Sequence, residues 1–318
     1  MPAFVTHYLF GIDAYKLLPK NKFKNNIKKN HCAFALGLQG PDVFFYYIPS
    51  HIMHKGNIGD VAHRKNTQAF FSYLLESRMF FSDNPKKQAI ADAYLIGFLG
   101  HYTLDCAAHP YVYAFTGYDA SNPPKVTEYF GQHAYFETEI DNELLYSKKF
   151  LLPSEFHQNA TIFLTPLQRS VISKMLSYAY RNTYPELNVH ALDVGLATHF
   201  MKVGTRLLHD PSGQKKVLLR LVEKVLFRCP LISPMMASDL YQFVPDPLNL
   251  AHKKWIHPWT GESSDESFIN LYNKAISHYY SRIINYCALV DSGFTAEGQK
   301  EFMQEYGNLS FLSGVSCR

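Results

Sequence analysis

The sequence predicts an all-α protein. Almost every periodic segment repeats its apolar residues at helical spacing, and Pro, Gly or Asn bounds each of these segments. Runs of strictly alternating apolar and polar residues between hairpin turns are absent. Helices are therefore expected over residues 31–38, 63–77, 87–109, 131–146, 166–181, 190–208, 214–227 and 265–290.

Two of these segments have the clearest helical pattern. In 63–77, Phe70 and Leu74 are four residues apart and form part of an apolar face. In 87–109, an apolar stripe continues from Ala91 to Cys106, and Pro110 predicts that this helix ends just after residue 109. Clusters of turn-forming residues at 119–124 and 230–247 predict loops, the first of them between two helices.

The composition is that of a folded globular protein. The 318 residues are 47% hydrophobic and 18% charged, which is enough to bury a core with a catalytic pocket. We divide the chain into 1–160, which contains the candidate site, and a helical extension, 161–318, packed on it as one continuous domain. The boundary is soft, because the sequence contains no internal repeat and no low-complexity linker.

Several function classes are disfavoured. The net charge of +4 and the lack of a basic stripe among aromatic residues argue against a nucleic-acid track. No apolar run approaches the ~20 residues that span a bilayer. The N-terminus lacks the pattern of a secretory signal, so we expect a cytoplasmic protein. The 5 scattered cysteines lack the spacing of a thiolate zinc site and are interpreted as reduced thiols.

The most specific motif is His101-x-x-x-Asp105-x-x-x-His109. Residues four apart lie on one face of a helix, so three side chains that can bind metal point the same way. With 15 His and 27 Asp plus Glu in 318 residues, chance supplies only ~0.06 such triples. Imidazole and carboxylate ligands without thiolates are typical of a catalytic zinc site with open positions.

A second pair, His133-x-x-x-Glu137, repeats the spacing on another expected helix. Each histidine alone is more often structural, and Glu137 could pair with a cation on a helix surface. Burying three histidines and two carboxylates among aromatic residues without a metal would be costly, so the constellation as a whole favours metal binding.

The order of these residues resembles the zinc-dependent phospholipase C family, which includes bacterial phosphatidylcholine-hydrolysing enzymes and the catalytic half of clostridial alpha-toxins. The resemblance covers about residues 1–146 and implies an all-α fold, similar to that of fungal zinc nucleases, with two or three zinc ions. It implies that Asp42, His63, His101 and Asp105 hold one zinc, and that His109, His133 and Glu137 hold a second. His7 would help to hold a third, which Asp105 bridges.

Three points of this resemblance stay open. His54 competes with His63 as a ligand, and His63 is preferred because it opens the helix expected over 63–77. An N-terminal amine is a zinc ligand in the secreted enzymes, but its role here is unassigned. The spacing from Asp105 to His109 is shorter than in those enzymes, and the spacing from His109 to His133 is longer.

The function expected from the sequence is a zinc-dependent phosphoester hydrolase that resembles phospholipase C. Asp42 would orient the attacking water or act as general base. The alternatives are a single-strand nuclease-like phosphodiesterase and a noncatalytic, zinc-stabilised helical scaffold. Glu139 and Asp141 are interpreted as supporting acids, and the segment with Trp255 and Trp259 as an aromatic cluster rather than a substrate wall.

Overall fold

The computed structural model describes residues 4–50, 58–124, 126–226, 228–230, 232–239, 244–306 and 308–317, and most of these are helical. The all-α prediction is confirmed, because the strands of this part of the chain are the two-residue β1 (Trp255–Ile256) and β2 (Ser263–Ser264), which pair antiparallel. None of the described helices has the length and apolarity that crossing a bilayer requires.

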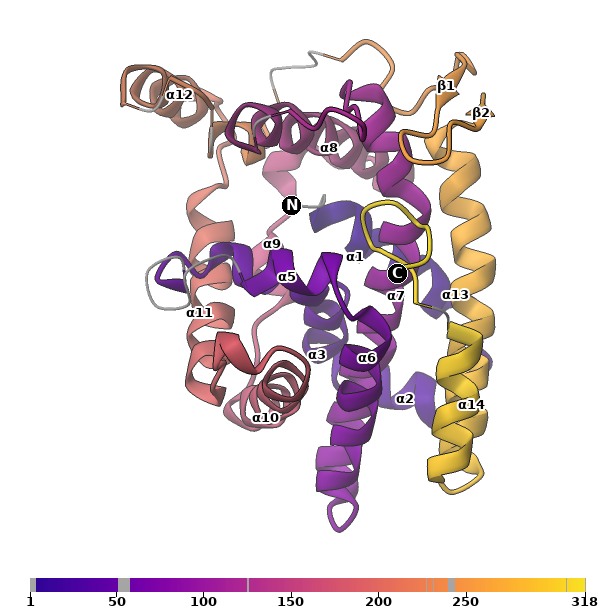
Figure 1. The fold of residues 1–318 in the computed structure, drawn as a ribbon. Coiled ribbons are helices and arrows are strands. Elements are labelled where there is room, and N and C mark those ends of the chain that lie inside the picture. The colour runs from indigo at the N-terminus through magenta and orange to yellow at the C-terminus, as the bar shows by residue number, and fades with distance from the viewer. Residues whose placement is uncertain are drawn as a thin grey trace.

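The elements follow one another along the chain as Figure 1 shows. The α-helices are α1 (Phe4–Leu17), α2 (Lys22–Lys29), α3 (His31–Gly37), α5 (Ile58–Arg64), α6 (Thr67–Glu76), α7 (Pro85–Phe115), α8 (Val126–Lys149), α9 (Gln158–Thr161), α10 (Pro166–Thr183), α11 (Ala191–Leu207), α12 (Gln214–Leu226), α13 (Phe268–Asp291) and α14 (Ala296–Tyr306). Short 3₁₀ segments are η1 (Gly40–Tyr46), η2 (Ser77–Phe81), η3 (Pro153–Glu155), η4 (Pro185–Leu187) and η5 (Ser233–Met235).

Helix α7 runs through the middle of the molecule and is the longest described helix (Figure 1). It begins with Pro85 in its first turn, and the Asn84 side chain accepts a hydrogen bond from the backbone N–H of Lys87. Its largest contacts are with α3 and α13. The Tyr279 hydroxyl on α13 donates to the carbonyl oxygen of Ile96 at 2.7 Å, which fixes the two helices against each other.

The hydrophobic core is continuous from the first helix to the C-terminal segment. Phe10 of α1 stacks on Tyr279 of α13 with ring centroids 5.3 Å apart, so residues from both halves of the chain share this core. Such aromatic pairs stabilise the fold beyond the contribution of the apolar area that they bury. The division at residue 160 stays a prediction.

Two of the helix boundaries that differ from the prediction lie beside candidate ligands. The helix expected over 63–77 is interrupted, because α5 ends at Arg64 and α6 begins only at Thr67. Asn66, with a φ of 52°, lies in the left-handed region that breaks a helix, and His63 therefore lies in the last turn of α5 instead of opening a helix. The prediction also omits helices α1, α2, α9 and α14.

Helix α7 also does not end at His109, as predicted, but continues through Pro110 to Phe115. Pro110 has no N–H to donate to the carbonyl oxygen of Cys106, four residues earlier. That oxygen faces Gly314 of the C-terminal segment, where a Cβ atom would come within 2.3 Å of it. A distant segment of the chain is thus packed closely against the interrupted turn of α7.

Candidate metal centre

Five of the eight predicted ligands lie on α7 and α8. Their i, i+4 spacing brings His101 and Asp105 together on α7, with 3.1 Å between Nε2 and Oδ2. On α8, His133 Nε2 is 3.0 Å from Glu137 Oε1. His109 joins the helices, because its Nε2 is 3.4 Å from the same Glu137 oxygen.

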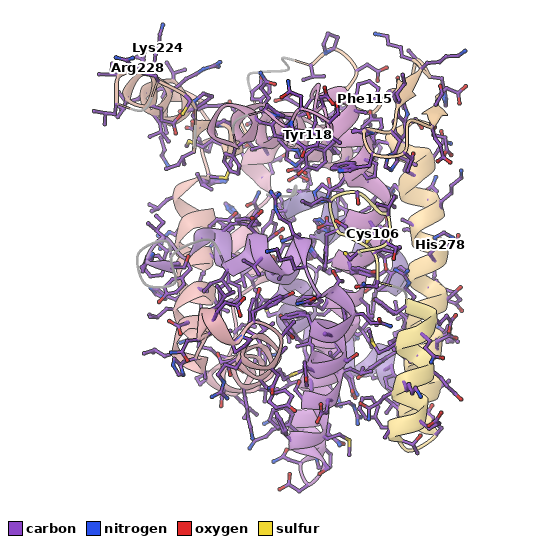
Figure 2. The ribbon with its side chains drawn as sticks, viewed as in Figure 1. Cys106, Phe115, Tyr118, Lys224, Arg228 and His278 are labelled. Carbon is purple, nitrogen blue, oxygen red and sulfur yellow. The ribbon has the colours of Figure 1, made fainter. Side chains whose placement is uncertain are left out.

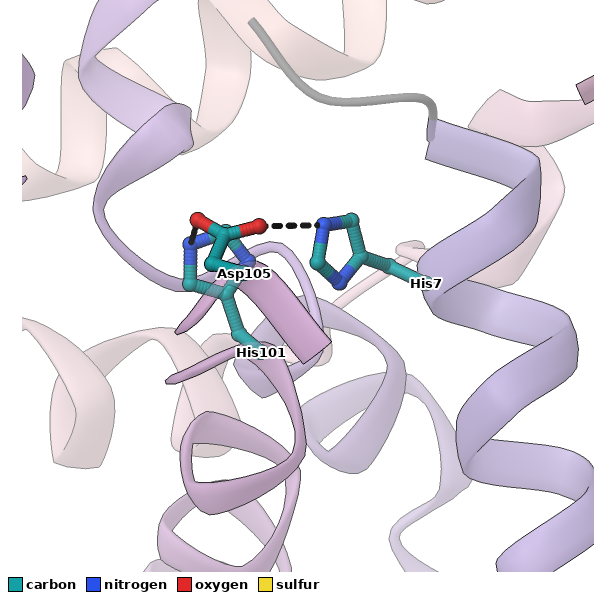
Figure 3. Close-up of side chains that lie close together, drawn as sticks. All are labelled: His7, His101 and Asp105. Atoms are coloured by element: carbon teal, nitrogen blue, oxygen red, sulfur yellow. Dashed lines mark ion pairs between the residues drawn. The ribbon is translucent and has the colours of Figure 1, made fainter. Parts of the chain in front are cut away.

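The other three predicted ligands come from three further elements. His7 is in the first turn of α1, and its Nε2 is 3.0 Å from Asp105 Oδ1. Figure 3 shows His7 and His101 on either side of Asp105. Asp42 follows the turn at the start of η1, and its Oδ1 is 3.1 Å from His63 Nε2.

Asp105 lies at the centre of this arrangement. Its Oδ2 is 3.6 Å from His63 Nε2 and 3.7 Å from His109 Nδ1, in addition to its contacts with His7 and His101. All eight predicted residues thus form one connected network, and each is at most 5% exposed. His54, the alternative to His63, lies outside the described residues.

Three groups within the network have the geometry of a metal site. They are His7, His101 and Asp105; Asp42, His63 and His101; and His109, His133 and Glu137. In each group one ligand atom per residue lies within 4.8 Å of the others. Tetrahedral zinc binds histidine nitrogens and carboxylate oxygens at ~2.0–2.2 Å, so ligand atoms around one ion lie this close together.

Backbone carbonyl groups orient three of the histidines. The Nδ1 atoms of His63, His101 and His109 lie 2.7, 3.2 and 2.7 Å from the carbonyl oxygens of Gly59, Leu38 and Phe311. A neutral ring that donates from Nδ1 carries a lone pair on Nε2, which is how second-shell carbonyls prepare zinc-binding histidines.

These lone pairs face carboxylate oxygens rather than donors. Both oxygens of Asp42 and Oδ2 of Asp105 are buried and receive no hydrogen bond from the described residues. Two acceptors 3.1 Å apart in a buried site repel each other unless a cation or a proton lies between them. The donor set therefore fits zinc, since nitrogen and oxygen ligands surround positions that need a positive charge.

The sequence that carries this network is similar to a known protein family. The profile described as zinc-dependent phospholipase C matches residues 6–201, which include all eight residues of the network. The chain belongs to the zinc-dependent phospholipase C family. No curated protein and no solved structure matches the chain. The family and the three groups of ligand residues together support a zinc phosphoesterase.

In this family member, the charged groups of the network strongly shift one another's pKa values. Burial alone would raise the pKa of Asp105, but the nearby His101, His109 and His7 lower it well below its usual range. Burial likewise opposes ionisation of Glu137, but His133 and His109 lower its pKa. Both carboxyl groups are therefore ionised near neutral pH, as ligands of zinc must be.

The histidines differ from one another. Burial lowers the pKa of His63, but Asp105 and Asp42 raise it more, to about 10. For His101 and His133 burial is the dominant effect, and their pKa values are lowered. In the metal-free protein near pH 7, His63 is consequently protonated while His101 and His133 are neutral.

Gly40 allows the backbone to pass directly beside His101. Its φ of 51° lies in the left-handed region, and a Cβ atom there would come within 2.2 Å of Cδ2 of His101. The turn through Pro41 then places Asp42 against His63. The Gly-Pro-Asp sequence thus has two structural roles, which are to make room for one histidine and to position a carboxylate.

Asp141 positions His7 through the start of α1. Its carboxylate accepts hydrogen bonds from the backbone N–H of Val5 at 2.9 Å and from the backbone N–H and hydroxyl of Thr6 at 2.6 and 2.7 Å. A carboxylate at a helix N-terminus accepts hydrogen bonds from free backbone amides and interacts favourably with the helix dipole. The supporting role expected for Asp141 thus agrees with this geometry, while Glu139 is buried on the same helix.

The C-terminal segment, residues 308–317, covers the network, and sequence reasoning missed it. The Phe311 ring packs edge-on against His63 with centroids 4.9 Å apart, and its carbonyl oxygen accepts from His109. The backbone N–H of Leu309 donates to the Tyr102 hydroxyl at 3.0 Å. No residue type marks a backbone carbonyl as a partner of histidine, so the sequence carries no signal for this contact.

An aromatic cluster adjoins His133. The ring centroids of Tyr113 and His133 are 4.7 Å apart, and Trp259 packs edge-on against Tyr113 with a centroid distance of 5.0 Å. Trp255 packs against Tyr111 at 5.7 Å. Both tryptophans therefore contact α7, as expected of a packing cluster. A cavity of about 380 Å³ lies between α8, α12 and the end of α7. None of the eight network residues lines it.

Proposed function

We propose that this chain hydrolyses a phosphodiester bond of phospholipids with two or three zinc ions held by the eight-residue network. The observation that carries the proposal is this network, in which Asp105 joins groups of ligand residues from five separate elements. The family match supplies the substrate class, because phospholipid is what the family description names. A cytoplasmic location also stays a prediction.

Each group of ligand residues would hold one ion. Zinc, when bound, supplies Lewis-acid activation of water and neutralises charge on the phosphoryl oxygens. His101 belongs to two of these groups, so the two groups share one ligand residue. Closely spaced metal ions are typical of enzymes that displace a leaving group from phosphorus in line.

Asp42 is proposed to accept the proton of the attacking water. Its carboxylate is buried among the other ligand residues. One oxygen lies against His63, so the other can accept a proton from a water molecule held between the ligand groups. His109, His133 and Glu137 would hold a further ion, which would supply positive charge for the leaving oxygen.

The test combines metal content with turnover. Zinc-loaded protein is assayed on phosphatidylcholine in detergent micelles, on a soluble phosphodiester and on single-stranded DNA. We expect hydrolysis of the phospholipid, with a loss of about 10³-fold or more in kcat for Asp42→Asn and Asp105→Asn. Asp119→Asn is the control, because this exposed carboxylate accepts its hydrogen bonds from Ser121 and Asn122 in its own loop.

Each outcome separates the alternatives. Turnover of DNA but not of phospholipid would replace the proposal with a nuclease. A protein with zinc fully bound but silent on all three substrates would be a noncatalytic scaffold. Equal activity of Asp105→Asn and the unmodified protein would contradict the assignment of the centre.

A further inference from the structure

Helix α12 is amphipathic, but its charged side faces the protein and its apolar side faces solvent. Its two buried residues are charged, Lys216 at 6% and Glu223 at 2% exposure. Glu223 accepts hydrogen bonds from the backbone N–H and hydroxyl of Ser233, and the Lys216 ammonium lies 5.1 Å from the centre of the Tyr135 ring. The polar side of α12 is therefore the side that faces the protein.

The aliphatic side of α12 faces solvent. Leu218, Leu221, Val222 and Val225 lie at i, i+3, i+4 and i+7 and form one stripe. The exposed fractions are Val217 51%, Leu218 65%, Leu221 58%, Val222 42%, Val225 80% and Leu226 66%. Figure 1 shows α12 at the periphery of the molecule, beyond the end of α8. Contiguous apolar patches of this kind mark interaction sites.

The charges beside this stripe are all of one sign. Asp210 and Glu223 are the only acidic residues between positions 209 and 230, and both are buried. Asp210 accepts a hydrogen bond from the backbone N–H of Lys216 at 2.8 Å, so neither acid reaches the surface. The exposed ions of this region are Lys215, Arg220, Lys224 and Arg228. Figure 2 shows Lys224 and Arg228 at the outer end of α12.

We propose that α12 docks the protein on the surface of an anionic phospholipid bilayer. A helix with Leu and Val on one face and Lys and Arg beside it lies in the plane of a membrane interface, with its apolar face among the acyl chains. The cations contact anionic headgroups, and their long side chains reach the aqueous layer. A neutral protein groove would bury the aliphatic stripe but would leave these cations without partners.

This inference extends the proposed function, because a phospholipid substrate is found in the surface that α12 would bind. The helix lies outside residues 6–201, so it is not part of the segment that matches the family. It also contributes none of the eight network residues. Docking and hydrolysis can therefore be tested separately.

The test is co-sedimentation of the full-length, zinc-loaded protein with vesicles of phosphatidylcholine containing about 30% phosphatidylserine. We expect binding that weakens at least about tenfold in Leu218→Gln/Val225→Gln, because two exposed apolar contacts are removed without a change in charge. We expect a similar loss for Lys224→Gln/Arg228→Gln, together with a weaker dependence on salt. Chelator-treated protein should bind the vesicles equally well.

The control is Leu17→Gln/Leu192→Gln, which removes two leucines that are 58% and 72% exposed outside α12. This variant should bind the vesicles like the unmodified protein. If the α12 variants keep full affinity for the vesicles, or if they convert a dimer to a monomer without affecting vesicle binding, the proposal is overturned. Failure of hydrolysis with vesicle binding intact would contradict only the proposed function.

Discussion

His109 Nδ1 lies 2.7 Å from the carbonyl oxygen of Phe311, a contact that joins α7 to a segment 202 residues later in the chain. The Phe311 side chain packs on a different part of the same centre, against His63 and His101. One residue thus orients a ligand through its backbone and covers two others with its ring. These two contributions can be separated by experiment.

Removal of residues 309–318 deletes the carbonyl that holds His109. We expect zinc affinity at the group formed by His109, His133 and Glu137 to fall by about 10–100-fold, because loss of an outer partner frees the ligand ring. Phe311→Ala keeps the carbonyl and should instead lower the free energy of unfolding by about 3 kcal/mol. Competition with a chromophoric chelator and denaturant unfolding measure the two effects.

Ser316→Ala is the control for both experiments, because this side chain is exposed while the backbone of the segment is retained. It should leave zinc affinity and stability unchanged. Zinc binding by the shortened chain with the affinity of the full chain would show that Phe311 has no role at His109.

Gly40→Ala should damage the centre much more than a comparable change elsewhere. Both Gly40 and Gly117 have a positive φ, at 51° and 69°, so alanine at either position costs about 1–2 kcal/mol in backbone strain. Only Gly40 lies against a side chain, and its new Cβ would require His101 to move. We expect loss of zinc and an additional destabilisation of a few kcal/mol from the clash.

Gly117→Ala is the matched control, because a Cβ there meets no atom within 4 Å. Zinc content by mass spectrometry and denaturant unfolding should show strain alone for Gly117→Ala. Full zinc occupancy in Gly40→Ala would mean that His101 is not a ligand.

Asp141→Asn tests whether the cap of α1 positions His7. The amide group cannot accept hydrogen bonds at both of its ends, so one of the contacts with Val5 and Thr6 is lost, at a cost of about 1 kcal/mol. His7 lies in the turn that this cap fixes, and we expect the ion that it would hold to dissociate first. Thr165→Ala, which removes the cap of α10, should cost similar stability without changing zinc content.

Zinc titration of Asp141→Asn gives the answer directly. A change in stability equal to that of Thr165→Ala, with an unchanged number of bound ions, would restrict Asp141 to a structural role. A loss of one ion would place His7 among the ligands.

Much of the centre could be predicted because helical geometry is local. The spacing of His101, Asp105 and His109 determines that they share one face of α7, whatever packs against it. The same holds for His133 and Glu137 on α8. The positions of His7, Asp42 and His63 depend on the tertiary fold, and only the order of residues in a known family indicated them.

The rest had no local signal. The carbonyl oxygens of Leu38, Gly59 and Phe311 orient histidines, but any residue type supplies a carbonyl. A proline such as Pro110 normally ends a helix, but α7 continues past it, with the C-terminal segment packed on the interrupted turn. Asn66 separates α5 from α6 by adopting a left-handed φ of 52°, a conformation that its residue type allows but does not require.

Zinc binding should release a proton from His63. The apparent zinc affinity should therefore rise with pH, whereas the stability of the metal-free protein should fall. Asp105 and Asp42 raise the pKa of His63 to about 10 against the opposing effect of burial. This pKa exceeds the value of ~6.5 in the unfolded chain, so His63 stabilises the metal-free protein fully below pH ~6.5. That contribution is lost as the pH rises through about 10.

Zinc requires the neutral ring, so binding must displace this proton. The apparent zinc affinity should therefore increase by up to about tenfold per pH unit between pH 7 and 10, while the metal-free protein becomes less stable over the same range. Calorimetric titration in two buffers of different ionisation enthalpy counts the protons released. The release should fall by about one proton in His63→Gln and stay unchanged in His278→Gln, whose ring is exposed on α13. Equal proton release from both variants would mean that His63 does not bind zinc.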